Sequence, residues 1–324
     1  MVGKLTSNEK ASASVIPAIM GVSNYTTPSE QLRKCLDAIA GKPDDFKGNE
    51  AMDWGNRLEA IGLEVAADRL GCSRIVTEIT TPYIHPDIPL ECSVDAIAEF
   101  DEETEIYTDP SKGIFVVGAD SITVKGAGCG ENKITSVMPE SQPHLARGPL
   151  QLQAQMMCTG LNWGFICVLY RGIEMRIFLY RAHPQTMTAI KDAVIDFDRR
   201  IYSNPTDWYD INSSEDVIAM FPEVESEDPI DLDADTIKLL HEYAALQETV
   251  AAADDTLKSM QIHFQKVMGN SSLATGDGFT LKWPMRNTRA QPEKVVPAKP
   301  ATSKRQSKVS IKLPKGEINV PSNS

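Results

Sequence analysis

Residues 124–136 read VKGAGCGENKITS, and with LECSVDAIAEF at residues 90–100 they decide the fold. Both stretches mix apolar and β-branched residues with single charged residues, a pattern typical of β-strands. Positions i and i+2 of a strand share one face, so Glu131 and Lys133 point the same way. Asp95 lies within the earlier stretch. The two stretches therefore predict neighbouring strands that bring one acid to an acid–base pair.

The residue types at this predicted meeting point suit a metal-assisted reaction. Two carboxylates, from Asp95 and Glu131, and a backbone carbonyl at Asn132 are hard oxygen ligands of the kind that Mg²⁺ prefers. A neighbouring lysine can position a metal-bound water, and a metal that polarises a phosphoryl oxygen generates the nucleophile for phosphodiester hydrolysis. The alternative is an exposed strand whose acid and base are solvated surface charge. The glycine-rich run before Glu131 is interpreted as a turn that leads into the strand, not as a phosphate-binding loop.

Outward from these strands, the chain predicts an α/β or α+β core with a mixed central sheet flanked by helices. A helix is expected to start near Pro28 in the run TTPSE, because proline is favoured in the first turn. Residues 163–182 predict a β-hairpin that turns at Arg171 and Gly172. Three further helices are expected, over residues 51–71, 146–162 and 183–203.

The composition changes beyond this core, which is expected to span residues 1–203. Residues 204–235 are acidic and rich in Pro, Ser and Asp, and they predict a linker or a loose excursion. Residues 236–285 predict a helical extension, as one or two helices, followed by a short strand. Residues 286–324 are rich in Lys, Pro, Ser and Gln and predict a disordered basic tail.

The bulk composition is that of a soluble globular protein, with 42% hydrophobic and 24% charged residues among 324. No run of about 18 uncharged apolar residues predicts a membrane span, and the N-terminal sequence lacks the apolar segment of a secretory signal. The six cysteines form no Cys-x-x-Cys pair, which argues against structural zinc or an iron–sulfur cluster. We therefore expect a cytoplasmic protein.

The charge of the chain is unevenly distributed. The net charge is −13, but residues 286–324 carry +7 and the remaining 285 residues carry −20. An acidic body disfavours general nucleic-acid binding, because the phosphate backbone is attracted to positive surface. DNA binding by this chain would need a local groove, a bound cation or the basic tail.

Two helical segments carry further polar residues that can join the predicted site. Glu59 follows Gly55 in the run GNRLE and can face the same end of the sheet, although an amphipathic helix would equally place it in solvent. Glutamines stand at 151, 153 and 155 before the apolar hairpin. Alternate positions on a helix do not share a face, so at most two of these glutamines can reach one site.

Taken in order, these motifs resemble the YqaJ-like viral recombinase family, which includes phage lambda exonuclease, in the PD-(D/E)XK nuclease superfamily. The resemblance covers roughly residues 10–285, and its specificity lies in the ordered set of motifs. The matching runs are SASVIPAIMGVSNYTTPSEQL at 12–32, GNRLE at 55–59, CSVDAI at 92–97, ENK at 131–133 and QLQAQMMCTGLNWG at 151–164.

The resemblance implies a restriction-endonuclease-like core and a Mg²⁺-dependent deoxyribonuclease, with Mn²⁺ as a substitute metal. Asp95, Glu131 and the carbonyl of Asn132 would hold the metal. The implied catalytic set is Glu59, Asp95, Glu131, Lys133 and Gln153, where Gln153 is chosen over Gln155 by counting back from Thr159. Ser14, Ser23 and Gln155 would contact DNA.

The implied reaction is 5′-to-3′ digestion of linear double-stranded DNA, which leaves 3′ overhangs for a single-strand annealing protein in phage recombination. By analogy the enzyme would be a homo-oligomer, a trimeric ring. Family members carry an arginine for the 5′ phosphate near the N-terminus, where this chain offers only Lys10. The alternatives are a structure- or site-specific RecB-like endonuclease, and a catalytically inactive DNA-binding accessory protein.

Overall fold

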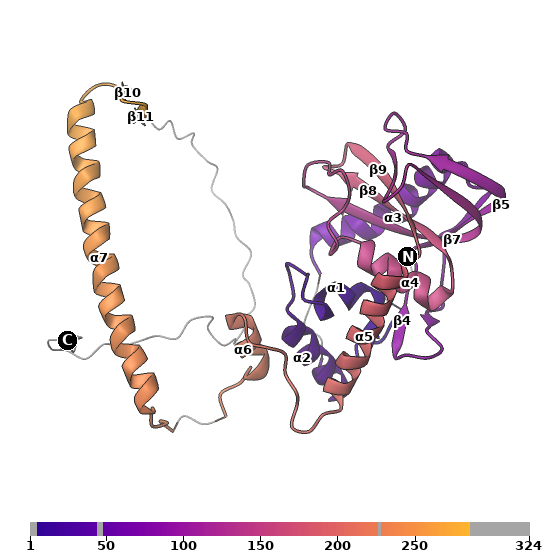
Figure 1. Cartoon of the computed structure of the whole chain (residues 1–324), viewed down its shortest axis with the longest axis horizontal. Helices are drawn as coiled ribbons and strands as arrows, with labels where there is room; N and C mark the ends of the chain where they lie inside the picture. Colours follow the sequence, from indigo (N-terminus) through magenta and orange to yellow (C-terminus); the bar gives the residue numbers. More distant parts are fainter. Residues whose placement is uncertain (1–4, 44–47, 226–227, 286–324) are drawn as a thin grey trace. The chain divides into compact units, whose positions relative to one another are not determined.

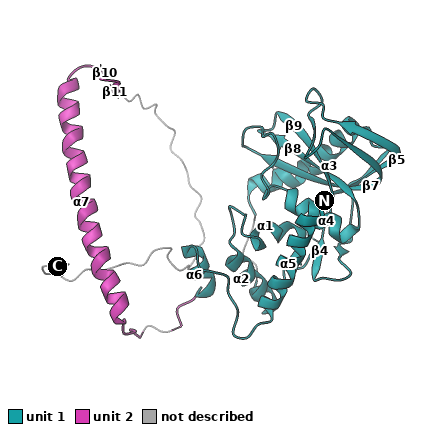
Figure 2. Ribbon diagram, in the orientation of Figure 1, with its two compact units in different colours: residues 1–222 teal, residues 223–324 magenta. Residues whose placement is uncertain are grey.

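The computed structural model describes residues 5–43, 48–225 and 228–285, and the predicted basic tail lies outside these ranges. Within them, every helix is too short or too polar to cross a bilayer. The chain divides into two units, residues 1–222 and residues 223–324 (Figure 2).

The first unit is built on a six-stranded sheet with the order β2-β5-β7-β8-β9-β6 (Figure 1). Strand β7 pairs antiparallel with β5 and parallel with β8, and β6 pairs parallel with β9, so the sheet is mixed as predicted. The strands are β2 (Arg74–Val76), β5 (Ala96–Tyr107), β6 (Ile114–Val116), β7 (Ser121–Thr135), β8 (Trp163–Tyr170) and β9 (Glu174–Arg181).

Helices cover both faces of this sheet. Successive residues of β8 point to opposite faces. Phe165 packs with Leu63 of α3 (Glu50–Leu70), whereas Ile166 packs with Leu152 of α4 (Pro149–Thr159). The mixed α/β class with helices flanking a central sheet is therefore confirmed.

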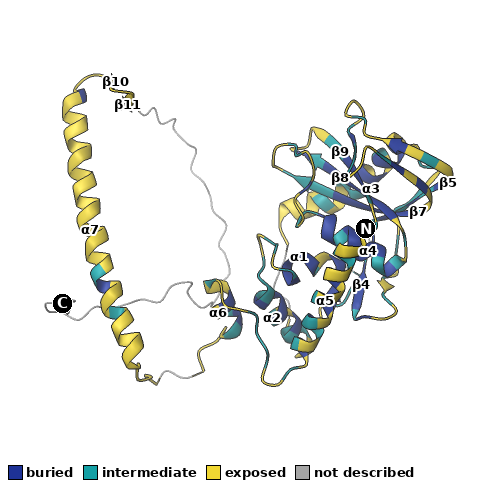
Figure 3. Cartoon of the chain, viewed as in Figure 1, coloured by how far each residue is buried: buried dark blue, intermediate teal, exposed yellow. Residues whose placement is uncertain are grey.

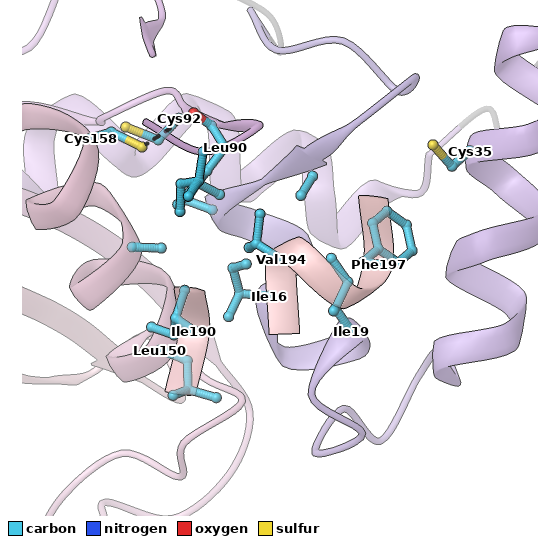
Figure 4. Packing of buried hydrophobic residues seen from close by; sticks show 14 of the residues in the cluster. Ile16, Ile19, Cys35, Leu90, Cys92, Leu150, Cys158, Ile190, Val194 and Phe197 are labelled. Carbon is cyan, nitrogen blue, oxygen red and sulfur yellow. Dashed lines mark hydrogen bonds between the residues drawn. The ribbon is translucent and has the colours of Figure 1, made fainter. Parts of the chain in front are cut away.

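Besides the apolar clusters on the two faces of the sheet, a further apolar cluster lies where the N-terminal segments meet α5 (Pro184–Ile201). Ile16, Ile19, Val194 and Phe197 belong to it (Figure 4). The other elements around it are β1 (Ala11–Ser12), a 3₁₀ turn η1 (Ala13–Val15), α1 (Ile16–Ile19), α2 (Pro28–Ile39), β3 (Tyr83–Ile84) and β4 (Leu90–Cys92).

The predicted start of α2 is confirmed in detail. The Thr27 hydroxyl accepts a hydrogen bond from the Glu30 amide at 3.1 Å, and the Glu30 carboxylate accepts one from the Thr27 amide at 2.8 Å. This capping box satisfies two amides that the helix leaves unpaired, and Pro28 occupies the first turn. The hairpin of β8 and β9 also turns at Arg171 and Gly172, both with positive φ.

The glycine-rich run GAGCG is not a turn but part of β7, contrary to the sequence prediction. Gly128 and Gly130 face the rings of β8: a Cβ at Gly128 would lie 2.3 Å from the Trp163 ring, and one at Gly130 2.8 Å from the Phe165 ring. The glycines are therefore required by close packing against aromatic side chains, which local turn signals do not reveal.

Residues 204–222 belong to the first unit, although the sequence predicts them as part of a linker. They contain α6 (Ser214–Met220), which packs on α2. Arg33 of α2 donates hydrogen bonds to the carbonyls of Ala219 and Met220, and its guanidinium lies over the Trp208 ring. Arg33 thus ties the end of α6 and the Trp208 ring to α2.

The described part of the second unit contains one long helix, α7 (Ala234–Met268), and a hairpin of β10 (Leu273–Gly276) and β11 (Phe279–Lys282). The sequence left open whether this region forms one helix or two. The structure has a single helix of 35 residues.

Candidate active site

Three predicted residues meet where β5 and β7 lie side by side. The antiparallel register pairs Ala96 with Gly130, which sets Asp95 next to the segment that carries Glu131 and Lys133. The backbone amide of Asn132 donates a hydrogen bond to Asp95 Oδ2 at 3.0 Å. The sheet register therefore assembles the acid–base cluster.

Glu131 is held from both sides. It is 1% exposed, and Lys133 Nζ lies 2.5 Å from its Oε1. Gln155 Nε2 on α4 donates to its Oε2 at 2.6 Å. Gln151, one helical turn before Gln155, accepts from Lys133 Nζ at 3.1 Å. Charged and neutral donors on both oxygens fix this buried carboxylate in one orientation.

The negative charge of the cluster is only partly balanced. Burial and then the neighbouring Glu131 raise the pKa of Asp95 well above its ordinary value. Burial, followed by repulsion from Glu131, also raises the pKa of Glu59. For Lys133, burial acts to lower the pKa, but attraction to Glu131 and Asp95 outweighs it and the pKa is raised. Three acids thus share one nearby lysine.

Glu59 stands on α3, half-buried, and senses the charges of Glu131 and Lys133. Within the described residues it makes no hydrogen bond to either side chain, so it flanks the cluster rather than belonging to its hydrogen-bonded centre. The amphipathic helix predicted here is confirmed, and it is the helix that presents Glu59 toward the cluster.

The three glutamines of α4 divide between two faces. Gln151 and Gln155 are four residues apart and both reach the cluster. Gln153 points elsewhere: its amide donates to the Arg181 carbonyl at 2.8 Å, and its oxygen accepts from the His183 amide at 2.8 Å. The choice of Gln153 as the site glutamine is not supported by this geometry, which favours Gln155. Counting back from Thr159 selected a glutamine whose side chain lies on the other face of α4.

The Asn132 side chain lies on the opposite face of β7, toward α3. Its Oδ1 accepts a hydrogen bond from Cys167 Sγ at 3.3 Å, and a Cβ at Gly62 would lie only 2.4 Å from that oxygen. Gly62 therefore allows α3 to approach the strand between Glu131 and Lys133. The sequence analysis did not single out Gly62, and it considered Gln151 without assigning it a role. The spacing of Gln151 from Gln155 was the available signal for the latter.

Residues 6–162 match the family profile described as the YqaJ-like viral recombinase domain. The chain carries a YqaJ-like viral recombinase domain. The match includes Glu59, Asp95, Glu131, Lys133 and Gln155, and it supports a nuclease of the phage type.

Solved structures of exonucleases also resemble the chain. An alkaline exonuclease from Laribacter hongkongensis (LHK-Exo) matches at 16% identity and a TM-score of 0.42, covering 60% of this chain and 88% of that one. The same exonuclease in complex with dAMP matches at 17% and 0.43, with the same coverage. A phage-related exonuclease from Haemophilus somnus 129PT matches at 12% and 0.34, covering 59% and 92%. No curated protein matches the chain in sequence.

The N-terminal residues that were predicted to meet DNA make their hydrogen bonds and ion pairs, within the described residues, to groups outside the cluster. Ser14 is exposed in η1, and its hydroxyl lies 3.3 Å from that of Ser12. Ser23 accepts from the Tyr25 amide and lines a separate polar cavity of about 330 Å³ beside α6. Lys10 is paired with the buried Glu91 at 2.7 Å.

The donors of the YqaJ-like domain suit a hard divalent cation. The carboxylates of Asp95 and Glu131 and a backbone carbonyl such as that of Asn132 are hard oxygen donors of the kind such a cation prefers. Gln155 Oε1 is buried without a hydrogen-bond partner in the structure, so the cluster retains an unused oxygen. Across the described ranges, no three His, Cys, Asp or Glu side chains group closely enough to hold a metal by themselves. A cation here would therefore complete its shell with water or phosphate, as Mg²⁺ commonly does.

Proposed function

We propose that the chain is a Mg²⁺-dependent exodeoxyribonuclease that digests linear double-stranded DNA from 5′ ends and leaves 3′ overhangs. The observation that carries this proposal is the contact of Lys133 with Glu131 beside Asp95, on adjoining strands of a YqaJ-like domain. Acids and a lysine in this arrangement match the needs of phosphodiester hydrolysis.

Asp95, Glu131 and the Asn132 carbonyl would hold the Mg²⁺, with Mn²⁺ as a substitute. When bound, the metal supplies polarisation of a phosphoryl oxygen and a water of lowered pKa. Three acids sharing one lysine support this assignment, because a cation would relieve their mutual repulsion.

The remaining residues position and balance charge. Lys133 would orient the attacking water and offset negative charge that develops on the phosphate. Gln155 would hold Glu131 in its metal-binding orientation, as an outer hydrogen bond fixes a ligand. Glu59 would accept a hydrogen bond from water at the margin of the site. Because Gln153 bonds only to backbone groups of Arg181 and His183, we assign it no part in the reaction.

The substrate and partners follow from the YqaJ-like domain as proposals. Duplex ends would be bound with help from Ser14 and Ser23, and the overhang would pass to a single-strand annealing protein in the cytoplasm of the host. A ring-shaped homo-oligomer, a trimer by analogy, would explain retention on DNA, since only its channel needs positive charge in an acidic chain.

Digestion of linear duplex DNA labelled at either the 5′ or the 3′ end, with Mg²⁺ or with EDTA, tests the proposal. We expect Mg²⁺-dependent release of 5′-end nucleotides and no action on closed circles. Asp95→Ala and Lys133→Ala should abolish release. The matched controls are Asp120→Ala and Lys125→Ala, because both side chains are exposed near or on the same strand.

Circular dichroism would establish that the variants remain folded, which matters because Lys133→Ala leaves a buried carboxylate without its charged partner. Full activity of either site variant would refute the site. Equal cleavage of closed circles would indicate an endonuclease, and inactivity of the folded wild-type chain under all metal conditions would indicate an accessory protein.

A further inference from the structure

Helix α7 carries a continuous apolar seam. Counted from Leu239, apolar residues recur at alternating steps of four and three through four heptads, without a polar interruption. The α7 seam consists of Leu239, Tyr243, Leu246, Val250, Ala253, Leu257, Met260, Phe264 and Val267.

Every residue of the α7 seam is exposed in the structure, as the colouring of the helix in Figure 3 illustrates. Leu246, Val250 and Leu257 are each more than 60% exposed. Scattered exposed apolar residues are ordinary, but a contiguous row along a whole helix marks a surface that another element covers.

The period of the seam identifies the kind of element that fits. A strict spacing of 3.5 residues gives a narrow stripe that follows the axis of a supercoil and receives the side chains of another helix. A helix that packs on a globular core shows a wider stripe with a period near 3.6. The occupant of the α7 seam is therefore a helix with a matching heptad repeat.

We propose that the α7 seam pairs with the α7 seam of a second copy of this chain, in parallel and in register, as a coiled coil. In this pairing each of the nine layers brings identical apolar residues together. Tyr243, Val250, Leu257 and Phe264 occupy the a positions, and Leu246 and Met260 are among the residues at d.

The residues that flank the seam are compatible with self-pairing. A residue at g of one helix faces the e residue five positions later on the other. These pairs are Glu242 with Gln247, Thr249 with Asp254, Thr256 with Gln261, and His263 with Met268. No pair sets like charges against each other, and two of the three lysines of α7 form ion pairs within the helix: Lys238 with Glu242, and Lys258 with Asp254 and Asp255.

Site-directed disulfide formation in the full-length chain tests this interface. Ala253→Cys places a thiol at a central d position, whereas Asp255→Cys places one two residues away at an outer f position. Under mild oxidation we expect Ala253→Cys to form a covalent dimer on a non-reducing gel at least tenfold faster than Asp255→Cys. Native thiols interfere little, because five of the six are buried and burial raises the pKa of the half-buried Cys72 to about 11.

A seam-breaking change provides the second readout. On the Ala253→Cys background, Leu246→Asp should slow dimer formation at least tenfold, while Glu248→Asp, which introduces the same residue at an outer position, should leave it unchanged. Slow cross-linking at position 253, or equal rates at positions 253 and 255, would overturn the proposal. This is the result expected if the seam packs on its own chain or on a different protein. The result does not depend on nuclease activity, so it stands or fails apart from the proposed function.

Discussion

Gln155 donates its side-chain amide to Glu131 across 2.6 Å, and this bond joins α4 to the strand that bears the proposed metal ligand. Gln155→Ala should therefore lower the cleavage rate about 10- to 100-fold, the usual effect of losing an outer partner of a metal ligand. The measurement is Mg²⁺-dependent release of 5′ label at saturating DNA.

Gln153→Ala is the matched control, two residues away on the other face of α4. It should cost about 1–3 kcal/mol of unfolding free energy, because the Arg181 carbonyl and the His183 amide lose their partner. Its activity per folded molecule should stay close to that of the wild type. A large rate loss at 153 with none at 155 would reverse our assignment.

Gly62 controls how closely α3 approaches the active strand. Gly62→Ala should destabilise the first unit by about 1–3 kcal/mol, because the new methyl group would crowd Asn132 Oδ1. Gly55→Ala, on the same helix with open space around it, should instead stabilise by up to about 1 kcal/mol through helix propensity. Urea unfolding measures both, and destabilisation at 55 equal to that at 62 would contradict the packing argument.

Metal binding should appear in stability as well as in activity. At a Mg²⁺ concentration of about one hundred times Kd, the first unit should gain about 2.7 kcal/mol, and EDTA should remove the gain. The thermal midpoint reports this without DNA. Asp95→Asn should lose the Mg²⁺-dependent rise, whereas Asp120→Asn should keep it. An unchanged rise in Asp95→Asn would place the metal elsewhere.

Arg33 fixes α6 and the chain before it to α2. Arg33→Met removes hydrogen bonds to two carbonyls and the contact with the Trp208 ring, so residues 204–222 should open more often. Limited proteolysis should cut this segment at least several-fold faster. Lys34→Met changes an exposed neighbour and should leave the cleavage rate unaltered.

The sheet and the acid–base cluster were predictable because their signals are local. Alternation along residues 90–100 and 124–136 marks strands, and the i, i+2 rule places Glu131 beside Lys133 without knowledge of the partner strand. The capping box at Thr27 and the positive-φ turn at Arg171 and Gly172 are equally local.

Other features depend on contacts between distant parts of the chain. The glycines at 128 and 130 resemble a turn until the rings of Trp163 and Phe165 are placed against them. Gln155 and Gln153 differ only in helical phase, which the position of α4 on the sheet decides. Arg33 holds a segment about 186 residues away, and the acidic composition of that segment concealed the contact.

β7 lies inside the sheet, paired with β5 up to Gly130 and with β8 from Cys129 through Glu131 to Thr135, and this position has a consequence for hydrogen exchange. Amide protons of an interior strand exchange with solvent only when the surrounding sheet separates, so they report the most stable cooperative unit of a protein. The strand that positions Glu131 and Lys133 should therefore not unfold while the rest of the first unit remains folded. Inactivation by heat or denaturant should coincide with global unfolding of residues 1–222.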